Sequence, residues 1–212
     1  MLKIHTFPLG PVMTNTYLVV DAETKQAVLV DPAWNGLFLL EQAVTYGVQL
    51  IQIWITHAHF DHIGGVGEIA ENMGMEVEIA LHPLDLPLWK MQGGASLFGI
   101  ELKGNLPEPA LLLEDGQQLT LGRHRFQVRH APGHTPGHVL FYEAEEGILF
   151  CGDVIFQGGI GRTDLPGGSY ETLMESIKTR IMNLPGNTRL FPGHGAPTRV
   201  ETERRENPFL AE

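Results

Sequence analysis

The segment His57-Ala58-His59-Phe60-Asp61-His62 places four metal-ligating side chains within six residues. It follows the almost continuously apolar run Leu50–Thr56, whose composition is typical of a buried β-strand. Side chains two positions apart on an extended backbone point in the same direction, so His57 and His59 can reach one cation together. The chain must therefore fold so that a buried strand ends at a metal-binding loop.

Asp61 and His62 are neighbours in the sequence, so their side chains project in different directions. We expect them to serve a second cation beside the first. Ile63-Gly64-Gly65 then lets the chain turn tightly into a helix, because glycine tolerates backbone conformations that other residues avoid. Neutral imidazole and carboxylate groups are the usual protein ligands of zinc and iron.

Three candidate ligands occur farther along the chain, each next to glycine at the end of a predicted strand: His134, Asp153 and His194. Glycine permits a close approach of the backbone at such positions. Each residue alone is a weak indication, because a single histidine is more often a packing or surface residue than a ligand. Together with the first segment, they supply enough donors for two metal ions.

Strand-like and helical patterns follow one another in both halves of the chain. The predicted strands are 16–20, 27–30, 50–56, 76–81, 118–121, 125–129, 139–143, 148–151 and 188–191. The predicted helices are 36–46, 64–73 and 170–184, the last with Ser169 as its N-cap. These patterns predict an α/β (α+β) fold with two layers of sheet and helices outside, over a single domain 1–212.

Residues 83–109 contain four prolines and four glycines, which makes long regular elements hard to sustain. A segment of this length without regular structure is uncommon in a compact domain unless it is functional or partly helical. We therefore expect a surface excursion beside the active site. Trp89 within it is a candidate to line a substrate groove.

Charge and composition exclude several classes of partner. The formal net charge of −11 disfavours binding to nucleic acid or anionic lipid. The single cysteine, Cys151, rules out an internal disulfide and is compatible with a reducing compartment. The sequence shows neither a signal-peptide pattern nor the roughly 18 consecutive apolar residues of a membrane helix. We expect a cytoplasmic protein, and the sequence gives no indication of its oligomeric state.

The order His-x-His-x-Asp-His, followed by His, Asp and His, resembles the metallo-β-lactamase superfamily along essentially the whole chain. The resemblance implies an αββα sandwich of two mixed sheets with helices outside. It also implies two ligand sets bridged by one carboxylate: His57, His59 and His134 for the first metal, Asp61, His62 and His194 for the second, and Asp153 between them. Zinc is the expected metal in both sites, with iron or manganese as alternatives.

The same resemblance implies a hydrolytic mechanism. A hydroxide between the two metals would be the nucleophile, because two cations lower the pKa of bound water and polarise the carbonyl that it attacks. Asp61 would also orient this hydroxide.

The segment Gly159–Gly168 resembles the glyoxalase II branch, and most closely the short bacterial YcbL-type proteins. That resemblance implies a small-molecule thioester substrate: S-lactoylglutathione would give D-lactate and glutathione, as in methylglyoxal detoxification. Longer members hold glutathione with basic residues of a C-terminal helical domain, which we expect this chain to lack. Arg162 is the best basic candidate to contact the substrate, although an ion pair with Asp164 or Glu171 explains it equally well.

Other activities stay open at this point. A persulfide dioxygenase of the same superfamily resembles the chain in the same Gly-Arg-Thr-Asp segment and uses one iron, for which the triad would be His57, His134 and Asp153. A lactonase of the superfamily is a further alternative. A non-catalytic zinc sensor or store is disfavoured, because the site has the carboxylates needed to activate water.

Three polar residues near the predicted ligands have other expected roles. Asp31 can hold a ligand histidine from behind, although an Asp-Pro turn explains it equally well. His138 has no ligand position left, so we expect it to support a ligand or to pack at the start of a strand. We expect Cys151 to be a buried, unreactive side chain.

Overall fold

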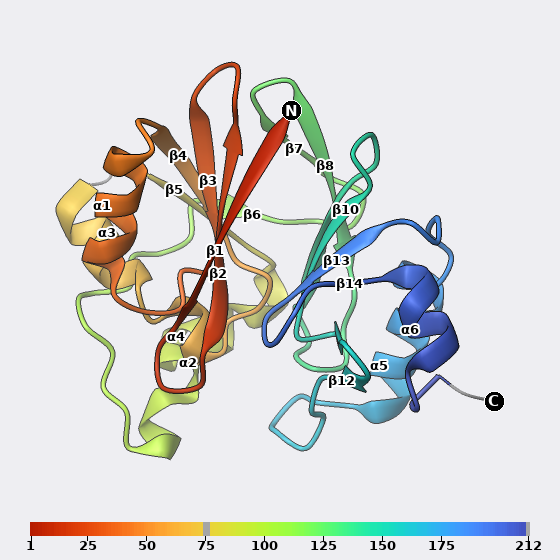
Figure 1. Cartoon of the computed structure of the whole chain (residues 1–212). Helices are drawn as coiled ribbons and strands as arrows, with labels where there is room; N and C mark the ends of the chain where they lie inside the picture. Colours follow the sequence, from red (N-terminus) through yellow and green to blue (C-terminus); the bar gives the residue numbers. More distant parts are fainter. Residues whose placement is uncertain (74–76, 211–212) are drawn as a thin grey trace.

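The computed structural model describes residues 1–73 and 77–210. Two six-stranded sheets face each other, with α1 and α3 outside the first sheet and α5 and α6 outside the second (Figure 1). This layering confirms the αββα sandwich expected from the sequence, with two mixed sheets and helices outside.

The first sheet has the order β1-β2-β3-β4-β5-β6. Its strands are β1 (Leu2–Leu9), β2 (Thr14–Asp21), β3 (Gln26–Val30), β4 (Gln49–Trp54), β5 (Glu78–Leu81) and β6 (Leu111–Leu112). The pairs β1–β2 and β2–β3 are antiparallel, and the pairs from β3 to β6 are parallel. The helices packed against this sheet are α1 (Gly36–Thr45), α2 (Phe60–Ile63) and α3 (Val66–Met73).

The second sheet has the order β14-β13-β10-β9-β8-β7. Its strands are β7 (Gln118–Leu121), β8 (His124–His130), β9 (Val139–Glu143), β10 (Ile148–Gly152), β13 (Arg189–Pro192) and β14 (Thr198–Arg199). Only β10 and β13 run parallel to each other within it. A small hairpin of β11 (Ile155–Phe156) and β12 (Gly159–Ile160) follows β10, and the outer helices are α5 (Tyr170–Ser176) and α6 (Val200–Glu206).

The core forms in three layers because the central strands are buried on both faces. Successive side chains of a strand point to opposite faces, so neighbouring residues enter different layers. In β3, for example, Val28 enters the layer between the sheets and Leu29 packs toward the helices. The layer between the sheets contains Trp54, whose ring lies 4.9 Å from that of Phe126. Its polar Nε1–H donates to Gln52, so the indole is buried without an unmet donor.

Most predicted elements occur within a few residues of their expected positions, and the differences have local causes. Ser169 caps α5 by accepting from the Thr172 amide, as predicted. The predicted helix 170–184 changes to a π-helical turn at Ile177–Ile181. β1 was not predicted, because Pro8 interrupts its pattern, and the strand indeed lies at the sheet edge, where proline is tolerated. Of the predicted strand 76–81, the first residue lies outside the described residues.

The excursion 83–109 is partly helical. It comprises a 3₁₀ turn at Pro83–Asp85, α4 (Leu86–Lys90) and a second 3₁₀ segment at Gln92–Phe98. Phe98 lines the cleft that contains the predicted ligands, so the segment lies beside the site as expected. Trp89, in contrast, is buried, donates to the Pro107 carbonyl and does not line this cleft. No helix of the described residues is both long and apolar enough to cross a membrane.

Candidate metal centre

The ends of several strands converge at one edge of the sandwich. The loop after β4 carries His57 and His59 and leads into the short helix α2, which carries Asp61 and His62. Asp153 follows β10 and His194 follows β13, and these two parallel strands pair at Gly152 and Pro192. Parallel strands end at the same edge of a sheet, so the two side chains are brought together. The turn between β8 and β9 supplies His134.

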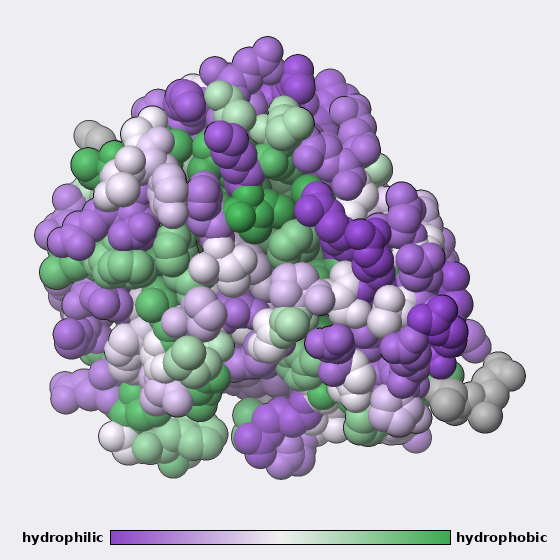
Figure 2. Space-filling model, in the orientation of Figure 1, coloured by the Kyte–Doolittle hydropathy of each residue, from purple (hydrophilic) through white to green (hydrophobic). Residues whose placement is uncertain are grey.

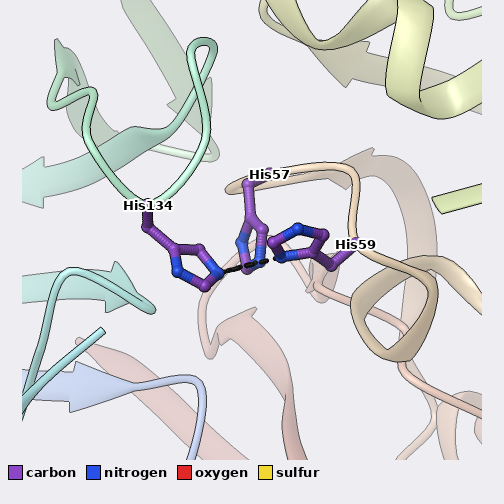
Figure 3. A group of neighbouring side chains, drawn as sticks. All are labelled: His57, His59 and His134. Carbon is purple, nitrogen blue, oxygen red and sulfur yellow. Dashed lines mark hydrogen bonds between the residues drawn. The ribbon is translucent and has the colours of Figure 1, made fainter. Parts of the chain in front are cut away.

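Three histidines form the first group (Figure 3). The Nε2 atom of His134 lies 3.1 Å from Nε2 of His57 and 2.9 Å from Nδ1 of His59. The side chains come from two separate loops, and their nitrogens point toward one another. Imidazole nitrogens at such distances around a common point can hold a transition-metal ion.

Hydrogen bonds on the far side of the imidazoles orient their ligand atoms. Nδ1 of His134 lies 2.7 Å from the carbonyl oxygen of Arg162, which can only accept, so this nitrogen carries the proton and Nε2 keeps its lone pair. Nδ1 of His62 lies 2.9 Å from Oδ2 of Asp31. Asp31 also accepts from the amide and the hydroxyl of Thr56, which fixes the carboxylate itself. Such outer hydrogen bonds fix ring orientation and make a ligand more basic.

Asp61, His62 and His194 form the second group, and Asp153 stands between the two groups. Oδ2 of Asp153 lies 3.6 Å from Nε2 of His134 and 3.5 Å from Nε2 of His194. The other oxygen, Oδ1, lies 3.4 Å from Nε2 of His62. One carboxylate therefore reaches donors of both groups, which makes it the natural bridge.

The donor set fits a pair of cations. Nε2 of His62 and Oδ1 of Asp153 are buried and lie 3.4 Å apart without forming a hydrogen bond. Buried polar atoms are costly unless they are bonded, and a bound cation would give both atoms a partner. The surrounding atoms are imidazole nitrogens and carboxylate oxygens, the donors that zinc, iron and manganese accept.

The electrostatics of the metal-free protein also indicate that the second group attracts positive charge. Burial lowers the pKa of His62, but the carboxylates of Asp153, Asp61 and Asp31 have a larger effect in the opposite direction. The pKa of His62 is therefore raised well above its usual value. Burial likewise opposes the charge of His194, yet hydrogen bonds to Asp153 and Asp61 raise the pKa of His194 to about 9. Protons on these imidazoles balance the carboxylates when no metal is bound.

Metal binding to the second group is expected to weaken as the pH falls. Below about pH 9, His194 carries a proton in the metal-free protein, and a cation must displace it because only neutral imidazole is a ligand. Affinity therefore rises with pH through that pKa. Calorimetric titration with Zn²⁺ at about pH 6 to 8, in buffers of different ionisation enthalpy, measures the released protons. A titration at pH 7 without proton release would contradict this expectation.

Two residues that position the site were not predicted from the sequence. Asp85 accepts from the Ala58 amide, the Thr135 hydroxyl and the Gly137 amide, so it joins the loop of the first two histidines to the turn that carries His134. Thr14 donates to Oδ2 of Asp61 at 2.8 Å. The partners are far apart in the sequence, so no local pattern pointed to them. The only signal was a carboxylate within the apolar run of residues 84–89.

The other polar residues have the following places. His138 is buried, accepts from the Asp153 amide and stacks on His57, which confirms that it supports the site from behind. Cys151 is buried, as expected. Arg162 lines the cleft, and its guanidinium pairs with Asp164 through two hydrogen bonds. The expected ion pair is therefore present, and the role of Arg162 toward a substrate stays a prediction.

Glycine is required where the loops pack against the ligands. A Cβ at Gly193 would overlap Oδ1 of Asp153, and Gly133 adopts φ +130, which other residues rarely accept. The donors open onto a cleft of about 220 Å³. Its lining includes five of the predicted ligands and four apolar side chains: His59, Asp61, His134, Asp153, His194, Val12, Phe60, Phe98 and Leu165. The cleft can admit a small molecule to the donors.

Curated relatives cover nearly the whole chain. The probable metallo-hydrolase YqgX of Bacillus subtilis is 37% identical over 99% of this chain and 98% of its own length. The hydroxyacylglutathione hydrolase GloC of Haemophilus influenzae is 35% identical over 99% and 98%. The mitochondrial persulfide dioxygenase ETHE1 of Bos taurus is 34% identical over 93% of this chain and 71% of its own length.

Solved structures agree with the fold. BLEG-1, a B3 metallo-beta-lactamase, superposes with a TM-score of 0.89 and 37% identity over all of both chains. TTHA1623 in a di-iron-bound form gives a TM-score of 0.87 and 43% identity over 97% of this chain and 100% of that protein. The family model of the metallo-beta-lactamase superfamily matches residues 9–194, a range that contains all seven predicted ligands. The chain belongs to the metallo-beta-lactamase superfamily.

Proposed function

We propose that the protein is a binuclear metal-dependent thioesterase that hydrolyses a glutathione thioester such as S-lactoylglutathione. The observation that carries the proposal is the second donor group, Asp61, His62 and His194, beside the three histidines of the first. A mononuclear enzyme has no need of that second group. The similarity to the hydroxyacylglutathione hydrolase GloC supports the choice of thioester chemistry.

In this proposal, His57, His59 and His134 would hold one cation, and Asp61, His62 and His194 would hold the other. Asp153 lies between the two groups and would serve both. When bound, two divalent cations lower the pKa of water and polarise a carbonyl. We take zinc as the first candidate, with iron and manganese as alternatives. The similarity to TTHA1623, whose structure is of a di-iron-bound form, supports iron as an alternative.

Asp61 has a second task beyond holding a cation. Burial opposes its charge, but His62, His194 and Thr14 lower the pKa of Asp61 to about 2, so the carboxylate is ionised at neutral pH. Thr14 fixes one of its oxygens by a hydrogen bond. Asp61 lines the cleft, and its carboxylate can orient the attacking water by accepting a hydrogen bond from it.

The proposed reaction is the hydrolysis of the thioester bond. Water adds to the thioester carbonyl carbon, the carbon–sulfur bond breaks, and a carboxylic acid and a thiol leave. We propose that Arg162, which lines the cleft, contacts a carboxylate of the thiol product while it also pairs with Asp164.

The direct test is hydrolysis of S-D-lactoylglutathione by protein whose bound metals have been counted. Fast turnover with about two metals per chain supports the proposal. No turnover with a single bound iron would overturn it and favour a dioxygenase acting on glutathione persulfide. The similarity to ETHE1 makes this second candidate a specific one, with His57, His134 and Asp153 as its triad.

The variant Asp61→Ala separates the two candidates. Hydrolysis is expected to fall by at least about 1000-fold, because the carboxylate both holds the second cation and orients water. A mononuclear dioxygenase would keep its triad and most of its activity. Asp115→Ala, at a half-exposed aspartate away from the cleft, is the matched control and should leave turnover unchanged. Near-normal hydrolysis by Asp61→Ala would contradict the binuclear assignment.

A further inference from the structure

An apolar pocket adjoins the metal cleft. Its volume is about 260 Å³, and its walls include Leu84, Leu88, Met91, Leu97, Phe98 and Pro166. It shares His59, Phe98 and Leu165 with the cleft, so the two spaces border the same residues. A group bound at the metal donors would therefore lie next to this pocket.

The pocket offers no positive charge. Among its lining residues, all of which the structure describes, only His59 and Asp85 are ionisable. His59 belongs to the donor group, and the carboxylate of Asp85 already accepts from three donors. The glutathione moiety carries two carboxylates and an ammonium group, so it would bind this pocket poorly. The acyl side of a thioester carries no such charges.

The pocket also leaves apolar surface in contact with solvent. Leu84 is 54% exposed, Met91 61% and Leu97 69%. Hydrophobic residues gather at the lower left of the space-filling view, over the helical segment that follows α4 (Figures 1 and 2). Exposed apolar surface that lines a concave site is typical of ligand binding, because a ligand that covers it removes that surface from water.

The size of the pocket indicates the size of its ligand. A space of 260 Å³ accommodates roughly eight groups the size of water or methylene. A lactoyl group has three non-hydrogen atoms beyond its carbonyl carbon and would fill about a third of it. A chain of six to eight carbons would fill most of it.

We propose that this pocket receives the acyl chain of the substrate, and that the enzyme prefers thioesters with apolar acyl groups of about six to eight carbons over the lactoyl thioester. The inference rests on the proposed thioesterase function and adds the class of acyl group. The polar thiol would lie toward Arg162, which lines the cleft but not the apolar pocket.

The first test varies the acyl chain at constant thiol. With metal-loaded protein, kcat/KM for the S-acylglutathione series from acetyl to octanoyl is expected to rise about two- to fourfold per methylene and to exceed that for lactoyl. The same series on N-acetylcysteamine should show the same dependence on chain length. Two results would overturn the inference: kcat/KM that changes with the thiol but not with the length of the acyl chain, or a higher kcat/KM for lactoyl than for hexanoyl. Either result would leave the thioesterase function standing.

The second test alters the pocket. Leu97→Asp places a charge at an exposed position of the wall and should lower the hexanoyl-to-lactoyl ratio of kcat/KM about tenfold. Leu37→Asp, at a residue of α1 that is 45% exposed and outside the pocket, is the matched control and should keep the ratio. An unchanged ratio in Leu97→Asp would refute the assignment of the pocket.

A binding measurement separates failure of the pocket from failure of the proposed function. If no thioester is hydrolysed, the thioesterase proposal fails, and calorimetry with hexanoate and lactate still tests the pocket. Hexanoate should bind the metal-loaded protein at least about tenfold more tightly than lactate, and Leu97→Asp should abolish that difference. Equal binding of the two acids would overturn the inference.

Discussion

Asp153→Asn is expected to reduce turnover by at least about 10⁴-fold and to lower the metal content below two ions per chain. Among the residues that the structure describes, Asp153 is the one side chain whose oxygens reach His134 in one group and His62 and His194 in the other. Removing its charge weakens both sites together. Removal of a group that only supports a ligand costs about 10–100-fold, so the two roles are distinguishable.

The Asp153 result is read from metal counting by mass spectrometry and from steady-state kinetics on the same preparation. Asp115→Asn is the matched control, since that aspartate lies outside the cleft. Circular dichroism of both variants shows whether the fold is retained. A variant that kept two metals and lost only activity would show that Asp153 acts in catalysis without bridging the cations.

Asp85→Ala is expected to destabilise the protein by at least about 3 kcal/mol and to weaken the first metal site. Its side chain is buried and accepts three hydrogen bonds, and each donor left without a partner costs about 1–3 kcal/mol. For a chain of this size the loss corresponds to a fall in Tm of roughly 6–12 °C. The turn with His134 would also lose its attachment to the loop with His57 and His59.

Thermal unfolding of the metal-free protein and zinc titration measure the two effects of Asp85 separately. Asp85→Asn keeps the volume and one acceptor oxygen, so it should give an intermediate loss of both stability and zinc affinity. Asp115→Ala serves as the control for an ordinary aspartate. If Asp85→Ala lost stability but bound the first zinc normally, the carboxylate would be a core residue with no positioning role.

The sequence predicted the seven donors because each lies in a local pattern: four occur together in the segment 57–62 after a predicted strand, and the other three each lie beside glycine at the end of a predicted strand. The fold followed for a similar reason: buried strands such as β3 and β10 are short apolar runs bounded by turns. Neither prediction needed knowledge of distant contacts.

The features that the sequence did not predict depend on contacts between residues far apart in the chain or lack a local apolar pattern. Asp85 meets Ala58, Thr135 and Gly137, and Thr14 meets Asp61, across large separations in sequence. The helix α6 escaped prediction because Val200 and Glu203 are its only buried residues, which leaves no apolar periodicity to detect. The apolar pocket likewise forms only when the segment 83–99 packs beside Leu165 and Pro166.

The donors come from loops of both sheets, so bound ions would tie together segments that lie as far apart as His57 and His194. In this respect the cations would act as cross-links between the two halves of the chain. Each ion that binds only the folded state stabilises the whole domain, by an amount that grows with the free metal concentration relative to the Kd of the ion. The lifetime of such a protein in a cell then depends on the supply of free metal as well as on its sequence, and metal starvation would remove the enzyme by unfolding as well as by loss of chemistry.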